Sequence, residues 1–135
     1  MAMNSDPDAV TGIPRLLLRL EGLAVLALSV LLFAQASHSW LLFGILFLAP
    51  DLSFLGYLAG PRVGAASYNA LHTYAGPLLL GGALVLTGSS VALPLIWTAH
   101  IGFDRLLGYG LKYPTDFSDT HLGRIGRRRT VGLEG

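Results

Sequence analysis

Four apolar runs separated by short turns make up most of this chain. The runs are residues 13–36, 40–59, 64–87 and 90–107. The turns are residues 37–39, 60–62 and 88–89. Each run is close to the ~20 residues that a helix needs to cross ~30 Å of hydrocarbon. The pattern predicts an all-α fold, a polytopic four-helix transmembrane bundle with short connecting turns.

The segments outside this predicted transmembrane domain, residues 13–107, are polar. Residues 1–12 are expected to be disordered, and residues 108–135 to form an interfacial tail. Lys and Arg occur at the start of the first run, in the second turn and in the tail, and the first and third turns have none. Because basic residues collect in cytoplasmic segments, this alternation predicts a multi-pass protein of the bacterial inner membrane with both termini in the cytoplasm.

The composition supports a membrane protein and narrows the chemistry. Hydrophobic residues make up 53% of the chain and charged residues only 13%, against about a quarter in soluble domains. Nine basic and eight acidic residues nearly cancel, and no basic stripe suggests nucleic acid. The chain has no cysteine, which excludes disulfides and thiolate chemistry. Any metal must therefore be held by His, Asp, Glu or backbone oxygen.

Ionisable side chains inside the apolar runs are the candidate functional residues, because burying them in a bilayer costs several kcal/mol each. They are Glu21, Asp51, His72, His100 and Asp104. At ~1.5 Å per residue, all five lie roughly 9 to 16 Å inside the predicted cytoplasmic boundary. Four different runs therefore offer a polar group to one layer of the membrane.

The spacing of these residues favours a metal site. His100 and Asp104 are four residues apart and share a helix face. Pro50 lacks an amide hydrogen and loosens the second helix directly before Asp51. Together with His72, these two carboxylates and two imidazoles could hold Zn²⁺, Mn²⁺ or Fe²⁺. Such an ion could turn a bound water into a nucleophile near neutral pH.

Several polar residues have simpler explanations. Glu21 could pair with Arg19 at the membrane interface. Asn69 could form a hydrogen bond between helices. The tail after Gly108 could fold back over the cytoplasmic mouth, bringing Lys112 or His121 towards a substrate. The favoured interpretation of that segment is instead a Gly-Pro turn anchored by interfacial tyrosines.

The chain resembles a family of small bacterial membrane proteins known as domain of unknown function 4260. The resemblance extends from about Leu16 to Gly126. It is densest in the segments 49–53, 68–73, 99–105, 108–113 and 120–123. The resemblance implies the membrane fold and brings no established activity.

A more distant similarity is to inner-membrane metal-dependent hydrolase-like proteins. Their pattern has Pro-Asp at the end of one span, His early in the next, and His-x-x-x-Asp later. The matching residues are Pro50-Asp51, His72, and His100 with Asp104. This chain departs from the pattern at Ser53, where a second acidic residue is usual. The similarity implies a membrane-embedded hydrolase.

Three functions are compatible with these residues. The leading hypothesis is a metal-dependent hydrolase of a lipid or lipid-linked substrate, with Asp51, His72, His100 and Asp104 as metal ligands and Glu21 or Asp104 as general base. The second is a small transport or proton-relay unit. The third is an accessory subunit of a larger membrane complex, with haem or another pigment bound by one of the histidines. Membrane lipids are the expected surroundings, and a homo-oligomer or larger complex the expected assembly.

Overall fold

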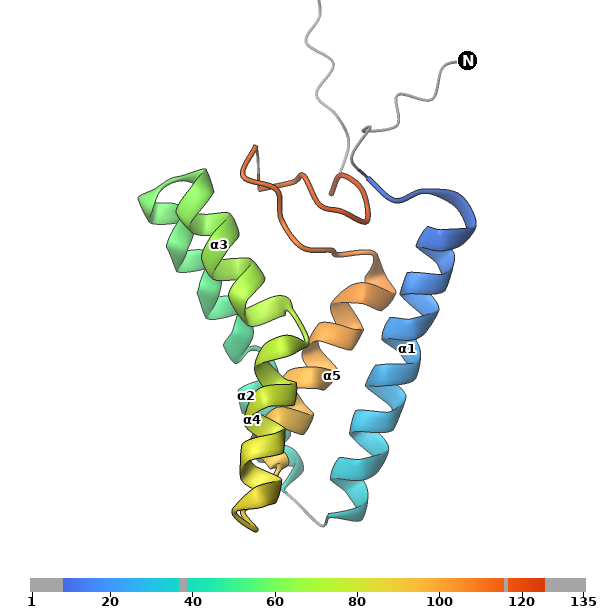
Figure 1. Ribbon diagram of the computed structural model, residues 1–135, viewed down its shortest axis with the longest axis vertical. Helices are drawn as coiled ribbons and strands as arrows, with labels where there is room; N and C mark the ends of the chain where they lie inside the picture. The colour runs from blue at the N-terminus through green and yellow to red at the C-terminus, as the bar shows by residue number, and fades with distance from the viewer. Residues whose placement is uncertain (1–8, 37–38, 116, 126–135) are drawn as a thin grey trace, which may run out of the picture.

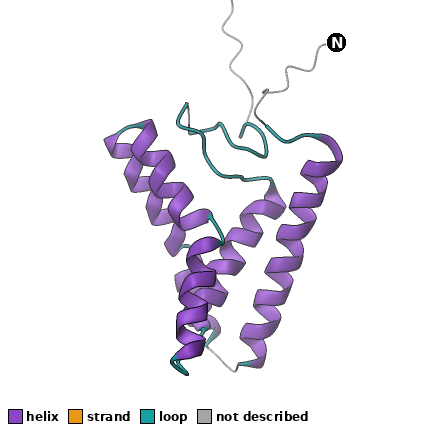
Figure 2. Ribbon diagram, viewed as in Figure 1, coloured by secondary structure: helices purple, strands orange, loops and turns teal. Residues whose placement is uncertain are grey.

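The fold is all-α, as predicted, but two of the four runs are divided (Figures 1 and 2). The computed structural model describes residues 9–36, 39–115 and 117–125. The elements are α1 (Gly12–Gln35), α2 (Trp40–Phe47), the 3-10 helix η1 (Ala49–Ala59), α3 (Pro61–His72), α4 (Ala75–Leu86) and α5 (Ala92–Leu107). The prediction of four continuous helices is therefore wrong: the described residues form five α-helices and one 3-10 helix. The disorder predicted at the N-terminus falls largely on residues 1–8, outside the described part of the chain.

The second run changes its helical geometry at Pro50. Proline has no amide hydrogen, so the α-helical hydrogen bond to the carbonyl of Leu46 is lost. The chain tightens instead, and the amide of Asp51 donates to the carbonyl of Leu48 at 3.1 Å. The hydroxyl of Ser53 donates to the carbonyl of Pro50 at 2.7 Å. Eleven residues of 3-10 helix follow, far more than the usual three or four, and such a stretch often marks a functional position.

The third run is broken after His72. Thr73 is extended, with φ −95° and ψ 146°, and α4 starts two residues later. Pro77 explains the position of the break, because it has no amide to donate to the carbonyl of Thr73 and is tolerated only in the first turn of a helix. The break leaves the last carbonyl groups of α3 available for partners from elsewhere in the fold.

Helix α5 is the centre of the molecule. It packs against α1, α2 and α4, whereas α3 packs mainly against η1. Figure 1 shows the η1–α3 pair leaning away from α1, with the segment after α5 lying across the opening between them. A small core of Phe33, Ala92 and Ile96 fills the opposite end of the molecule. This arrangement brings the breaks in the second and third runs against the middle of α5.

The backbones of α1 and α5 touch at a pair of glycines. A Cβ atom built on Gly102 would lie 2.7 Å from the carbonyl oxygen of Gly22 and 2.9 Å from the amide nitrogen of Leu26. A Cβ on Gly22 would meet the carbonyl oxygen of Gly102 at 2.7 Å. Small residues that allow such close approach are typical of helix pairs in membranes.

This contact predicts opposite effects for the same substitution at two glycines. Gly102→Ala should lower the free energy of unfolding by about 1–3 kcal/mol, because backbone atoms of α1 leave no room for the methyl group. Gly82→Ala is the matched control: no heavy atom lies within 4 Å of its Cβ position, so alanine should stabilise α4 by roughly 0.5–1 kcal/mol. Unfolding in mixed detergent micelles measures both values, and equal effects would contradict the close crossing.

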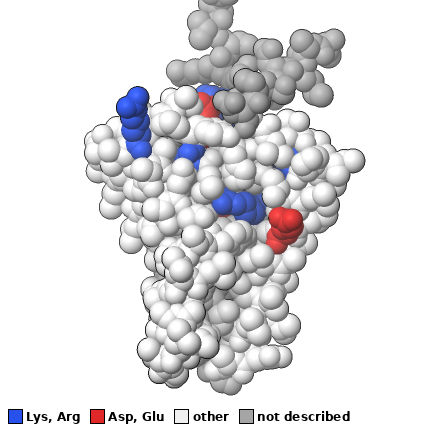
Figure 3. Space-filling view, in the orientation of Figure 1, with Lys and Arg blue, Asp and Glu red and all other residues white. Residues whose placement is uncertain are grey.

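Two helices are long and apolar enough to cross a membrane. By length and composition they are Gly12–Gln35 and the combined segment Trp40–Ala59. Their large apolar side chains point mostly outwards, and Leu58 of η1 is 88% exposed. On the face drawn in Figure 3, charged atoms lie towards the chain ends and the opposite part has none. These features suggest membrane association, since soluble proteins rarely expose so large an apolar surface.

Candidate metal centre

Four predicted ligands meet where the two helix breaks lie against α5. Asp51 is in the first turn of η1, His72 is the last residue of α3, and His100 and Asp104 lie one turn apart on α5. One donor atom from each lies within 4.8 Å of the others. His72 and His100 are fully or almost fully buried, whereas the side chain of Asp51 is 35% exposed. The prediction that these four residues are neighbours is confirmed.

Most of the distances between the donor atoms are close to those of a tetrahedral metal site. The two imidazole Nε2 atoms are 3.1 Å apart. Asp51 Oδ1 is 3.3 Å from each of them, and Asp104 Oδ2 is 3.4 Å from each. In a tetrahedral site with bonds of ~2.0–2.1 Å, neighbouring ligand atoms lie ~3.3–3.4 Å apart. Five of the six edges of the polyhedron are therefore close to this length, and the sixth, between the two carboxylate oxygens, is within 4.8 Å, so a carboxylate must move inwards for all four atoms to bind one ion.

The chemistry of the donor set also fits a divalent ion. Two imidazole nitrogens and two carboxylate oxygens are ligands that Zn²⁺, Mn²⁺ and Fe²⁺ accept. Two carboxylates in an apolar interior carry two negative charges, which one divalent ion would balance. The cluster of Asp51, His72, His100 and Asp104 could therefore hold a metal ion.

The orientation of His72 is fixed by Tyr68, one turn earlier on α3. Nδ1 of His72 is 2.8 Å from the carbonyl oxygen of Tyr68, which makes Nδ1 the protonated nitrogen. Nε2 is then left with its lone pair directed at the other ligands, as in most metal-bound histidines. The Tyr68 ring stacks on the imidazole with centroids 3.7 Å apart, and its hydroxyl donates to Asp104 Oδ2 at 3.5 Å. Tyr68 was not predicted as part of the site, although its i, i+4 spacing from His72 was a usable signal.

Two side chains of α5 satisfy the carbonyl groups exposed by the break after α3. Trp97 Nε1 donates to the carbonyl of Leu71 at 2.7 Å, and Arg105 Nη2 donates to the carbonyl of His72 at 2.9 Å. Arg105 is itself buried and also donates to the carbonyl of Tyr109 at 3.0 Å. The end of α3, and with it His72, is therefore held against α5 by side chains that sequence reasoning did not single out.

The tail after α5 folds back over the end of the molecule that carries the site. Gly108, with φ 88°, ends α5, and the amide of Tyr109 donates to the carbonyl of Asp104 at 2.8 Å. The amide group of Asn69 then binds the backbone of Lys112, accepting from its N–H at 2.6 Å and donating to its C=O at 2.8 Å. The segment folds back, which was the less favoured interpretation, and the partner of Asn69 lies in this tail, whereas a partner on another helix was predicted.

The side chains of Lys112 and His121 form hydrogen bonds within the tail. Lys112 Nζ donates to the carbonyl of Phe117 at 2.7 Å and lies 3.7 Å from the centre of that ring and 4.9 Å from that of Tyr68. His121 Nδ1 accepts from the amide of Leu111 at 2.8 Å. Burial, with the positive charge of Arg105, lowers the pKa of His121 and so favours the neutral ring that can accept this bond.

Glu21 lies apart from the four-residue cluster. Its side chain is exposed on α1, although depth alone predicted it in the same layer. Four of the five ionisable residues are therefore neighbours, and the rotation of α1 directs the fifth outwards.

Comparison with known proteins identifies the family. Residues 15–125 match the family described as Domain of unknown function (DUF4260), in agreement with the predicted extent of the resemblance. No curated protein and no solved structure matches the chain. The distant similarity to metal-dependent hydrolases therefore stays a prediction. Since the match covers most of its length, the chain belongs to the DUF4260 family.

Proposed function

We propose that this protein is a metal-dependent hydrolase of the bacterial inner membrane that acts on a lipid or lipid-linked ester or phosphoester. The observation that carries the proposal is the close grouping of donor atoms from Asp51, His72, His100 and Asp104. The set lies in a molecule whose outer surface is apolar over most of its length. A metal site with its opening on such a surface suits a substrate that is dissolved in lipid.

The proposal includes four membrane crossings with both termini in the cytoplasm. The crossings would be α1, α2 with η1, α3 with α4, and α5. Broken helices are tolerated inside a membrane where other protein groups satisfy the freed backbone. The carbonyl groups of Leu71 and His72 meet this condition through Trp97 and Arg105.

The chemical roles follow from the exposure of the ligands. A bound divalent ion would lower the pKa of water and polarise the substrate carbonyl or phosphoryl group. Asp51 is the most exposed ligand, so substrate would approach from its side. Asp104, oriented by the Tyr68 hydroxyl, would accept the proton through its carboxylate. Glu21 is the second candidate for this base, from its exposed position on α1.

A proton relay is the alternative that a specific observation supports. Tyr68, Asp104, His100, His72 and Asp51 form a continuous chain of polar contacts of 3.1 to 3.5 Å. Protons can move along such chains in membrane proteins. An accessory subunit with a haem or another pigment bound by His72 or His100 stays a prediction.

Elemental analysis of the detergent-purified protein tests the proposal. We expect about one Zn, Mn or Fe per chain in the wild type and none in His100→Ala, because the remaining three donors no longer close the polyhedron. His121→Ala is the matched control and should keep the metal, since His121 lies outside the cluster. A metal-free wild type, purified without chelators and after incubation with each ion, would refute the hydrolase and favour the relay.

A further inference from the structure

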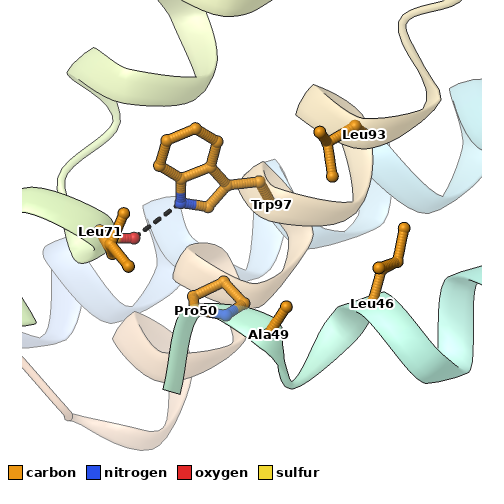
Figure 4. A pocket seen from close by; sticks show the side chains of 6 residues that line it. All are labelled: Leu46, Ala49, Pro50, Leu71, Leu93 and Trp97. Carbon is orange, nitrogen blue, oxygen red and sulfur yellow. Dashed lines mark hydrogen bonds between the residues drawn. The ribbon is translucent and has the colours of Figure 1, made fainter. Parts of the chain in front are cut away.

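An apolar pocket is lined by residues that include the direct chain neighbours of two candidate ligands (Figure 4). Its volume is about 180 Å³. The lining residues come from α2, η1, α3 and α5, and they are Leu46, Ala49, Pro50, Leu71, Leu93 and Trp97. Three of these four elements, η1, α3 and α5, also carry the candidate ligands.

The Trp97 side chain forms a fixed wall of this pocket. Its indole N–H is already used by the carbonyl of Leu71 at 2.7 Å, as the dashed line in Figure 4 shows. The backbone of Gly76 lies against the far edge of the indole, where an added Cβ would come within 2.6 Å of a ring carbon. The one polar group of the lining side chains is thus satisfied, and what remains for a ligand is apolar contact.

The pocket and the cluster follow one another along a single stripe of α5. Leu93, Trp97, His100 and Asp104 are spaced by four, three and four residues, so they share a helix face. The first two line the pocket and the last two are candidate ligands. The stripe is ~16 Å long. A molecule lying along it would have its polar end at the cluster and its apolar end in the pocket.

The other walls show the same relation. Pro50 precedes Asp51 and Leu71 precedes His72, so these two lining residues are each joined by one peptide bond to a candidate ligand. The pocket lies on the side of the cluster towards the N-terminus of α5. In the proposed topology that side faces the middle of the bilayer, and the cluster lies nearer the cytoplasm. This is the orientation of a lipid in the inner leaflet.

We infer that the pocket is a binding subsite for an acyl chain, and that it holds about six carbons of the chain nearest the carbonyl group bound at the cluster. An engineered apolar cavity of ~150 Å³ holds benzene, so a volume of this order suits about six carbon atoms. A helix, ~10 Å across, is too wide to occupy it. The inference rests on the proposed function and narrows its substrate to fatty-acyl esters.

Trp97 supplies a direct reporter of binding. The chain has two tryptophans, so Trp40→Phe leaves Trp97 as the only one. Bromine quenches tryptophan on contact, so 6-bromohexanoate should quench the Trp40→Phe protein with a saturable curve, whereas bromoacetate, which has no chain, should not. Adding Ala49→Leu should weaken this binding by about tenfold or more, since it fills a large part of the pocket. Ala83→Leu, the same change on an exposed position of α4, should leave it unaltered.

Quenching that rises linearly with the concentration of 6-bromohexanoate, and equally in all of these proteins, would show that the quencher only partitions into the micelles. That result would overturn the inference. A second pair, Leu93→Phe in the pocket and Leu79→Phe on the lipid-facing side of α4, decides the matter should Ala49→Leu fail to fold. Metal content is measured on the same samples. Bound metal without saturable quenching removes the acyl subsite alone, whereas absence of metal removes the proposed function.

Discussion

Arg105→Met is expected to lower the free energy of unfolding by about 3–5 kcal/mol. Methionine fills a similar volume but removes two charge-assisted hydrogen bonds, to the carbonyl groups of His72 and Tyr109. The His72 carbonyl is at the end of α3 and the Tyr109 carbonyl lies just after α5, and Arg105 donates a hydrogen bond to each. The end of α3 should also become less well held, so metal affinity should fall roughly 10–100-fold. Denaturation in mixed micelles and a competition titration with a metal-binding dye measure the two effects.

Arg62→Met is the matched control for this prediction. Arg62 lies in the first turn of α3 with an exposed side chain, and its loss should change stability by less than ~0.5 kcal/mol. Equal effects of the two substitutions would mean that Arg105 does not hold the break. A loss of stability with unchanged metal affinity would mean that the hydrogen bonds of Arg105 stabilise the fold but do not determine the position of the His72 side chain.

Chelation of the wild-type protein is expected to reduce its thermal stability. A ligand at 100 times its Kd stabilises the folded state by ~2.7 kcal/mol, which corresponds to roughly 10 °C for a chain of this size. The metal would connect η1, α3 and α5, because its four candidate ligands come from these three elements. A melting curve followed by circular dichroism, with and without the metal identified by elemental analysis, gives the shift.

Asp104→Asn should abolish this dependence on metal. The substitution keeps the shape of the side chain and removes the charge that balances the ion, so the curves with and without metal should coincide. A metal-dependent shift of the same size in Asp104→Asn would place the ion somewhere other than in the cluster. The two curves of the variant therefore locate the site independently of any enzymatic assay.

The four candidate ligands could be predicted because ionisable side chains are rare inside apolar runs. Asp51, His72, His100 and Asp104 differ so strongly from their surroundings that depth and spacing were enough to group them. Depth does not define the rotation of a helix, however. Glu21 satisfied the same criterion and is exposed, because its position around α1 follows from the contact between Gly22 and Gly102.

The helix breaks and their partners were harder to predict. Hydropathy is continuous through the third run, so the run reads as one helix although Pro77 marks where α4 must begin. The roles of Trp97 and Arg105 are bonds to backbone carbonyl groups far away in sequence, and nothing in either residue type specifies those partners. The tail likewise binds Asn69 through the backbone N–H and C=O of Lys112. Every residue except proline has both groups, so the residue type does not reveal this contact.

The position of the tail has a consequence for how the protein is made. The segment after α5 begins at Gly108, so it leaves the ribosome after α5 and all earlier elements (Figure 1). All four candidate ligands come earlier in the chain, so they leave the ribosome before Gly108 and the segment that follows it. An ion delivered during translation could therefore reach the cluster before this segment binds Asn69 of α3.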